Sequence, residues 1–246
     1  MATSPSAVLY ATADGVATVT LNRPKRLNAY DVAMRDSLAE ALAAAADDIE
    51  VRVVVLRGAG SCFSTGGDLY EFGTSPSPLA ARAARFARDV PGSLARFPKP
   101  LIAAVHGYAV GSGLEMALLA DFSVAAADAR FRLPEVGLGM IPGVGGTQTL
   151  PRAVGLGRAA EIILARRWVD AREAEAMGIV TRVVPAAELG EAVSRLAVRL
   201  AALAAPLVAR ARRALVAGLD RPLAAGLVLE AWLALRHRAG IMETRS

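Results

Sequence analysis

Runs of apolar residues divide the first two thirds of the chain into short strands. Residues 8–12 and 16–21 flank Asp14-Gly15, a pair typical of a tight hairpin turn. Residues 51–56 form a continuous apolar run, the pattern of a strand that is buried on both faces. Further strands are expected at residues 101–105, 122–126, 130–133 and 180–184.

Helical periodicity appears between these strands. Asp31 is placed to cap a helix that runs to about residue 47, with apolar positions at helical spacing: Met34, Leu38, Ala41, Leu42 and Ala45. A loop over residues 73–78 precedes an Arg/Ala-rich helix expected from about Leu79 to Phe97, with a break at Pro91-Gly92. From Gly157 onward the pattern is mostly helical. The sequence therefore predicts an α/β fold of strand–turn–helix units, with a core over residues 1–190 and a helical region over residues 191–246.

Two glycine-rich turns follow buried strands. They are Thr65-Gly66-Gly67 and Gly111-Ser112-Gly113, and each is expected to open a helix and to present backbone N–H groups. Brought together, two such turns would clamp a single oxygen and stabilise an oxyanion. Glycine-rich turns also serve purely structural roles. Neither turn fits the dinucleotide or P-loop patterns, so nucleotide binding is not indicated.

Two carboxylates lie in apolar surroundings. Glu115 is the single charge in the segment GYAVGSGLEMALLA, residues 107–120, and Glu135 lies between Leu133-Pro134 and an apolar, glycine-containing run. Burial would push the two pKa values apart, so that one group acts as a base and the other as an acid. The alternative is that each carboxylate caps a helix or pairs with an arginine, which is the better interpretation of Glu135 taken alone.

Composition and charge exclude several classes of protein. The net charge of +5 comes almost entirely from arginines that are scattered along the chain, which argues against a nucleic-acid platform and suits an anionic small substrate. The single cysteine, Cys62, rules out an intramolecular disulfide, and the two histidines, His106 and His237, lack a ligand-like spacing for zinc. No signal segment or membrane span is recognised, so a cytoplasmic location without membrane contact is expected.

Taken together, these motifs resemble those of the crotonase superfamily, the enoyl-CoA hydratase/isomerase family. NRPKRLNAY resembles its early NRP…NA element, FSTGGDL its first oxyanion turn, and residues 99–155 its signature block. The likeness covers roughly residues 8–235, with the motifs in order and at family spacing. It implies a spiral of repeated ββα units that ends in a helical trimerisation region, and an assembly that is a homotrimer or a hexamer.

The resemblance also implies roles for individual residues. The backbone N–H groups of Thr65 and Ser112 would form an oxyanion hole for a thioester, at positions where the family commonly has Ala and Gly. Ser112 would then have to accept the backbone angles that a glycine adopts. Glu115 and Glu135 match the two catalytic glutamates of true hydratases, at the same separation of twenty residues. Glu115 would activate a water molecule, and Glu135 would exchange the proton at the α-carbon.

Coenzyme A, as part of the substrate, is expected to lie along the early loops. The residues implied to line its path are Lys25, Arg26, Leu27, Gly67, Asp68 and Gly111. The loop Gly73–Gly92 is expected to form a wall of the acyl pocket. No metal or redox cofactor is implied. The ending LEAWLALRHRAGIMETRS differs from the EG…AF.EKR.P.F pattern with which family members contact the adenine end of CoA, so the resemblance does not extend to that contact.

The function expected from this resemblance is hydration of an enoyl-CoA thioester to a 3-hydroxyacyl-CoA in fatty acid metabolism. Two other readings stay open at this level. One is a different reaction on the same oxyanion hole, such as Δ3,Δ2-enoyl-CoA isomerisation or a specialised biosynthetic step. The other is a non-catalytic member that binds a CoA ester, RNA or a protein partner, although paired glutamates and scattered arginines argue against it.

Overall fold

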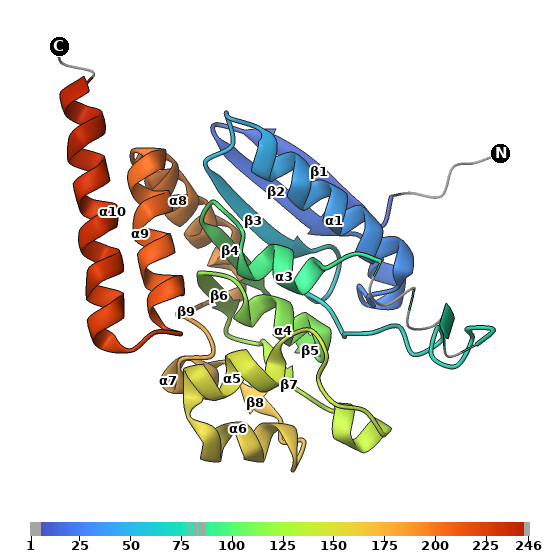
Figure 1. Ribbon diagram of the computed structural model, residues 1–246. Helices are drawn as coiled ribbons and strands as arrows, with labels where there is room; N and C mark the ends of the chain where they lie inside the picture. The colour runs from blue at the N-terminus through green and yellow to red at the C-terminus, as the bar shows by residue number, and fades with distance from the viewer. Residues whose placement is uncertain (1–5, 78, 81–82, 84–86, 244–246) are drawn as a thin grey trace.

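A mainly parallel sheet of six strands forms the centre of the structure, a computed structural model that describes residues 6–77, 79–80, 83 and 87–243 (Figure 1). The strand order is β1-β2-β3-β4-β6-β9, and only the β1–β2 pair is antiparallel. Asp14 and Gly15, both at positive φ, form the hairpin turn that the sequence predicts. The strands are β1 (Val8–Ala13), β2 (Val16–Leu21), β3 (Val53–Gly58), β4 (Leu101–Val105), β6 (Phe122–Ala126) and β9 (Arg182–Val184).

A second, smaller sheet contains β5 (Tyr108–Val110), β7 (Arg130–Arg132) and β8 (Val169–Asp170). Here β5 follows β4 and β7 follows β6, so the chain alternates between the two sheets. The segment after β3 joins the same series through a parallel bridge between Ser64 and Ala109. Each unit therefore contributes a strand to the main sheet and a shorter one to the second, which produces the predicted spiral.

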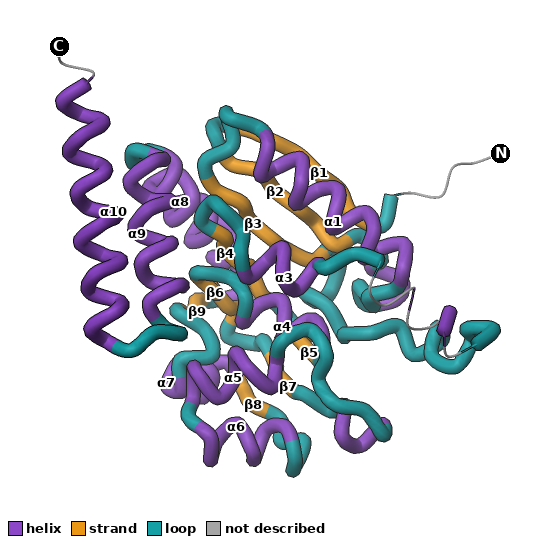
Figure 2. The backbone as a smooth tube through the Cα atoms, viewed as in Figure 1, coloured by secondary structure: helices purple, strands orange, loops and turns teal. Residues whose placement is uncertain are grey.

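Alternating side chains place the two faces of the main sheet in two separate cores. Val54, Leu56 and Ala103 face the larger core, into which α1 (Val32–Asp47) also packs. Val53 and Ile102 face the other core, which α8 (Leu189–Ala201) covers. Figure 2 shows helices on both sides of the sheet, with α1 in front of β1 and β2. Burial on both faces explains why these strands read as continuous apolar runs.

Six further α-helices lie after β5 in the described part of the chain. They are α4 (Ser112–Leu118), α5 (Gly146–Val154), α6 (Leu156–Ile163), α7 (Ala171–Met177), α9 (Ala205–Gly218) and α10 (Leu223–Glu243). Helices α9 and α10 lie side by side at one edge of the molecule (Figure 1). Arg212 of α9 joins this pair to the body, since its Nε lies 2.8 Å from the largely buried carboxylate of Asp121.

No single described helix is long and apolar enough to cross a membrane. By length and composition alone, two consecutive helical segments, residues 186–201 and 205–218, are long and apolar enough when counted together, but the chain bends by 106° between them. The division into a core of residues 1–190 and a C-terminal helical region stays a prediction.

Two local expectations were wrong. Pro91 and Gly92 do not break a helix but lie in the first turn of α3 (Val90–Ala95), where Asp89 accepts a hydrogen bond from the Gly92 N–H. Proline is tolerated there because the first N–H groups of a helix have no helical partner. Most of residues 78–86, which hold the start of that expected helix, lie outside the described residues. Residues 69–73 form turns, so the first glycine-rich turn opens no helix.

Candidate active site

The buried side chain of Asn28 organises the first glycine-rich turn. Its Nδ2 donates to the carbonyl oxygens of Ala59, Cys62 and Phe63 at 2.8, 2.8 and 3.1 Å, and its Oδ1 accepts from the Arg23 N–H. Asn28 has a positive φ of 54°, which asparagine tolerates better than most residues. The loop after β2 therefore fixes the path of the chain after β3. Sequence reasoning noted Asn28 only as part of the NRP…NA element.

Backbone pairing brings the two glycine-rich turns together. Ser64 donates its N–H to the Tyr108 carbonyl at 3.0 Å and accepts from the Val110 N–H at 3.0 Å. The two segments therefore run parallel and end at the same edge, each in a glycine-rich turn. A Cβ atom added to Gly66 would lie 2.6 Å from the Val110 oxygen and 3.3 Å from the Ser112 nitrogen. This close approach requires glycine at residue 66, as does its positive φ of 87°.

The hydrogen bonds of the first turn identify which N–H is available to a ligand. Thr65 donates its N–H to the Leu27 carbonyl at 3.1 Å, so this amide is already used within the fold. The bridge between Tyr30 and Gly67 uses the Gly66 carbonyl and the Asp68 N–H. Among the described residues, nothing accepts a hydrogen bond from the Gly67 N–H. The structure thus corrects the assignment of Thr65 as the donor and makes Gly67 the candidate, two residues further along.

In the second turn, the N–H of Ser112 has no acceptor among the described groups, because the first bond of α4 runs from the Glu115 N–H to the Gly111 carbonyl. The positive φ of this turn belongs to Gly111, at 53°, whereas Ser112 has ordinary helical geometry. A side chain at residue 112 therefore causes no backbone strain, contrary to the expectation that this position needs glycine angles. Two unused amides, from Gly67 and Ser112, lie on turns that touch.

Glu115 is a buried carboxylate with defined donors. Its side chain is on α4, and the residue is only 1% exposed. Oε1 accepts hydrogen bonds from the N–H groups of Val144 and Gly146 at 2.8 and 2.7 Å, at the start of α5. These donors and the positive end of the α5 dipole stabilise the ionised carboxylate. Glu115 thus acts as a cap for α5, and it also remains beside the second glycine-rich turn.

Glu135 approaches the same turn from the other side. It begins the 3-10 helix η2 (Glu135–Leu138), and a Cβ added to Gly111 would lie 2.7 Å from its Oε1. Its Oε2 is buried and has no hydrogen-bond partner among the described groups. Burial, with a smaller contribution from the negative charge of Glu115, raises the pKa of Glu135 from 4.5 to about 7. Both carboxylates therefore lie beside one turn, where Glu115 is held by N–H donors and Glu135 has a raised pKa.

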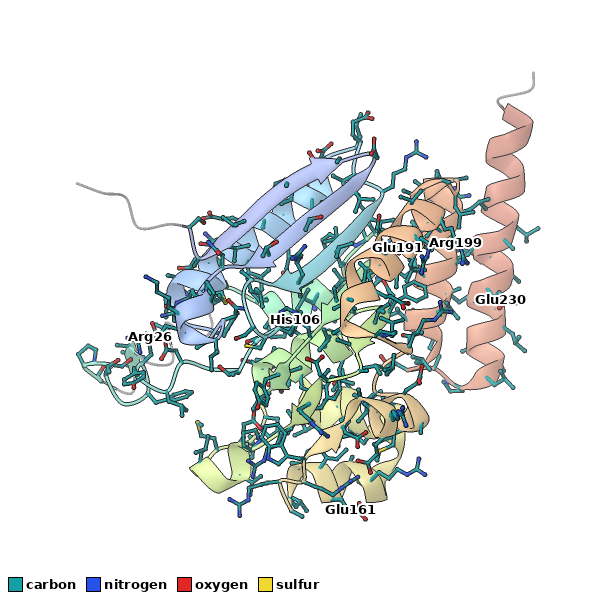
Figure 3. The ribbon with its side chains drawn as sticks, turned by 180° about the vertical axis from the view of Figure 1, so that it is seen from behind. Arg26, His106, Glu161, Glu191, Arg199 and Glu230 are labelled. Carbon is teal, nitrogen blue, oxygen red and sulfur yellow. The ribbon has the colours of Figure 1, made fainter. Side chains whose placement is uncertain are left out.

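The residues expected along coenzyme A have different surroundings. Lys25, Arg26 and Leu27 are exposed around the 3-10 helix η1 (Pro24–Arg26), and the Arg26 guanidinium lies 4.8 Å from the centre of the Tyr70 ring. Figure 3 labels Arg26 beside the loop that follows the first turn. Asp68, in contrast, is buried and pairs with Arg23 at 2.9 Å.

Burial alone would raise the pKa of Asp68, but hydrogen bonds from Arg23 and from the Tyr70 N–H lower it. The charge of Asp68 therefore helps to hold the loop.

Other reactive groups do not form a second site within the described part of the chain. His106 lies at the end of β4, where its Nε2 is 3.0 Å from the Gly60 carbonyl (Figure 3). Cys62 is buried, and burial raises the pKa of its thiol, which disfavours a nucleophilic role. No cluster of three or more His, Cys, Asp or Glu residues suited to a metal is found in the described ranges.

Comparison with known proteins identifies the family. Residues 11–238 match the sequence model described as enoyl-CoA hydratase/isomerase. A Rhizobium meliloti protein named probable enoyl-CoA hydratase is 39% identical over 225 residues, which are 91% of this chain and 86% of that protein. The (E)-benzylidenesuccinyl-CoA hydratase of Thauera aromatica is 39% identical over 216 residues, 87% of this chain and 83% of the relative.

Solved structures agree with the fold. The enoyl-CoA hydratase of Bacillus anthracis superimposes with a TM-score of 0.88 at 35% identity, over 93% of this chain and 89% of that one. The expected spiral fold is therefore confirmed.

Proposed function

The chain belongs to the enoyl-CoA hydratase/isomerase family, and we propose that it hydrates the α,β double bond of an enoyl-CoA thioester to give a 3-hydroxyacyl-CoA. The observation that carries this proposal is the pair of carboxylates around Gly111. Glu115 Oε1 accepts hydrogen bonds from two N–H donors, while the pKa of Glu135 is raised to about 7. One base and one acid beside the same turn suit addition of water across a double bond.

The proposed step uses each group once. Glu115 takes a proton from water as the water oxygen bonds to the β-carbon, and the π electrons move toward the thioester oxygen. The N–H groups of Gly67 and Ser112 stabilise that enolate oxygen, a contribution of about 3–4 kcal/mol for one well-placed donor. Glu135 then gives its proton to the α-carbon. The proton held by Glu115 returns to Glu135 through solvent, so the reaction consumes no net proton.

The substrate is proposed to enter along the exposed residues Lys25, Arg26 and Leu27. Positive charge from Lys25 and Arg26 suits the phosphates of coenzyme A. The mechanism needs no metal or redox cofactor. One relative is named for benzylidenesuccinyl-CoA, so enoyl-CoA thioesters with different acyl groups are candidate substrates. A role in fatty acid metabolism and a cytoplasmic location stay predictions.

Self-assembly is part of the proposal. Exposed apolar side chains are concentrated on α9 and α10, including Leu215, Leu219, Leu223, Leu227, Val228 and Leu235. Such a surface marks an interaction site. We propose that copies of this chain cover it in a homotrimer or hexamer.

A product assay tests the reaction. Purified protein is incubated with a trans-2-enoyl-CoA of four to ten carbons, and the products are identified by mass spectrometry. Hydration predicts loss of the conjugated absorbance and formation of a 3-hydroxyacyl-CoA. A parallel incubation with a 3-enoyl-CoA tests the isomerase alternative, which needs one proton-shuttling carboxylate and would create the conjugated absorbance. Isomerisation without hydration at any chain length would reject the hydratase proposal.

A further inference from the structure

The hydroxyl of Ser112 is a buried polar group without a partner. Ser112 is 7% exposed, and no described group forms a hydrogen bond with its Oγ. A buried hydroxyl left in this state costs about 1–3 kcal/mol, so such groups usually contact a ligand or an ordered water. Ser123, the matched case in β6, is 4% exposed and donates from its Oγ to the Ala117 carbonyl at 2.8 Å. The two serines are equally buried, but only Ser123 is satisfied within the fold.

Residue 112 is the one position of this turn where a side chain fits. Gly111 needs its positive φ, and a Cβ at Gly113 would lie 2.6 Å from the Ser64 carbonyl oxygen. Ser112 has helical geometry and no such clash. The serine side chain is therefore an addition that the turn accommodates without strain.

The Ser112 hydroxyl lies on the same side of the turn as the Ser112 N–H that is proposed to bind the thioester oxygen. In a helix, the Cα–Cβ bond tilts toward the N-terminus, which is also the direction of a free N–H in the first turn. The Ser112 hydroxyl and the Ser112 N–H thus face the same space, on the side of Gly66, where a Cβ atom added to that glycine would lie 3.3 Å from the Ser112 nitrogen. An oxygen that accepts from this N–H lies within reach of the hydroxyl of the same residue.

We propose that the Ser112 hydroxyl is a catalytic group, a third hydrogen-bond donor to the thioester oxygen beside the N–H groups of Gly67 and Ser112. The inference rests on the proposed function. Because negative charge on that oxygen increases in the enolate, the third bond strengthens in the transition state and acts mainly on kcat. The hydroxyl adds a donor that backbone amides alone do not supply.

The test compares Ser112→Ala and Ser112→Gly with wild type, with Ser123→Ala as the control for loss of a buried hydroxyl. Loss of one oxyanion donor predicts a decrease in kcat of about a hundredfold to a thousandfold for both Ser112 variants, with KM little changed. The second readout is the absorbance of a bound conjugated dienoyl-CoA. Hydrogen bonds to its thioester oxygen shift the band to longer wavelength, so both variants should show a smaller shift than wild type and than Ser123→Ala.

The results distinguish a catalytic Ser112 hydroxyl from one that binds only water, and both from failure of the proposed function. Wild-type kcat in Ser112→Gly, or an unchanged band shift in both variants, would overturn the proposal and leave a hydroxyl satisfied by an ordered water. Wild type that shifts the band but does not hydrate any enoyl-CoA would reject the proposed function while the spectral comparison still decides the role of Ser112. Absence of both activity and band shift in wild type would overturn the two proposals together.

Discussion

At the scale of single residues, the candidate site consists of two carboxylates and two backbone amides, some of which form hydrogen bonds with described parts of the fold and some of which do not. Glu115 is held by two N–H groups, whereas Glu135 has one buried oxygen without a partner among the described groups. The sequence made both glutamates candidates, because a charge in an apolar segment is conspicuous, and the family resemblance supplied their expected roles. The amide donor could not be predicted in the same way. Whether Thr65 or Gly67 has a free N–H depends on pairing with Leu27 and Tyr30, and such distant pairing leaves no local signal.

The raised pKa of Glu135 predicts the pH dependence of hydration. Glu135 must be protonated in order to give a proton to the α-carbon. The protonated form is lost as the pH rises through about 7. We expect kcat/KM to fall by about tenfold per pH unit well above that pKa, since kcat/KM reports the free enzyme. Because hydration consumes no net proton, kcat/KM for dehydration of the 3-hydroxyacyl-CoA must fall over the same pH range. Steady-state rates in both directions between pH 5.5 and 9 check this, and a flat or rising profile above pH 7 would contradict it.

At the scale of elements, the geometry of the candidate site depends on the contact between the two glycine-rich turns more than on the shape of either turn alone. The long strands and α1 were predicted correctly, because they bury regular apolar patterns. Strands β5 and β8 were missed, since three and two residues are too few to show a period. The helix expected after Gly67 is absent, and the segment there is held by pairing with residues 27–30 instead.

Substitution of Gly66 tests the contact between the two turns. In Gly66→Ala, the added Cβ would meet the Val110 oxygen at 2.6 Å, so the turns must separate. We expect a loss of at least about a hundredfold in kcat/KM, because a small displacement of an oxyanion donor removes most of its effect. Gly178→Ala is the matched control, since Gly178 also has positive φ but its nearest neighbour would be 3.6 Å away. Equal activity in both variants would show that the contact is unimportant.

Asn28 tests the connection between the early loop and the first turn. Asn28→Ala leaves three buried carbonyl groups without their common donor, and alanine disfavours the positive φ. We expect the free energy of unfolding to fall by about 2–4 kcal/mol. Denaturant unfolding measures this. Asn22→Ala, which removes one exposed hydrogen bond to the Ser6 carbonyl, should cost under about 1 kcal/mol. Similar losses in the two variants would contradict the organising role of Asn28.

At the scale of the whole molecule, the fold was predictable because its motifs resemble one family from residue 8 to residue 235. What the sequence did not reveal is how the C-terminal helices are held. Helix α10 packs mainly on α9, and α9 is joined to the body by the pair of Arg212 and Asp121, which are 91 residues apart in the chain (Figure 1). Such a pairing depends on the complete fold and has no local pattern.

The exposed apolar face of these helices predicts self-assembly. The double variant Val228→Glu/Leu235→Glu places two charges on one face of α10, where burial of an unpaired charge is costly. Light scattering coupled to size exclusion should show a trimer or hexamer for wild type and a smaller species for the variant. Leu156→Glu, an equally exposed leucine of α6, should assemble like wild type. A wild-type monomer, or a variant with unchanged mass, would reject this interface.

The proposed function requires Glu115 and Glu135 to act together in the addition of water to an enoyl-CoA. Its most direct test is the rate of crotonyl-CoA hydration by wild type, Glu115→Gln and Glu135→Gln, repeated with longer enoyl-CoA thioesters. Glu161→Gln, an exposed glutamate of α6, serves as control (Figure 3). We expect wild type and the control to hydrate the substrate equally, and each active-site variant to be slower by about a hundredfold to ten-thousandfold in kcat. Full activity in either active-site variant, or no hydration by wild type at any chain length, would contradict the account.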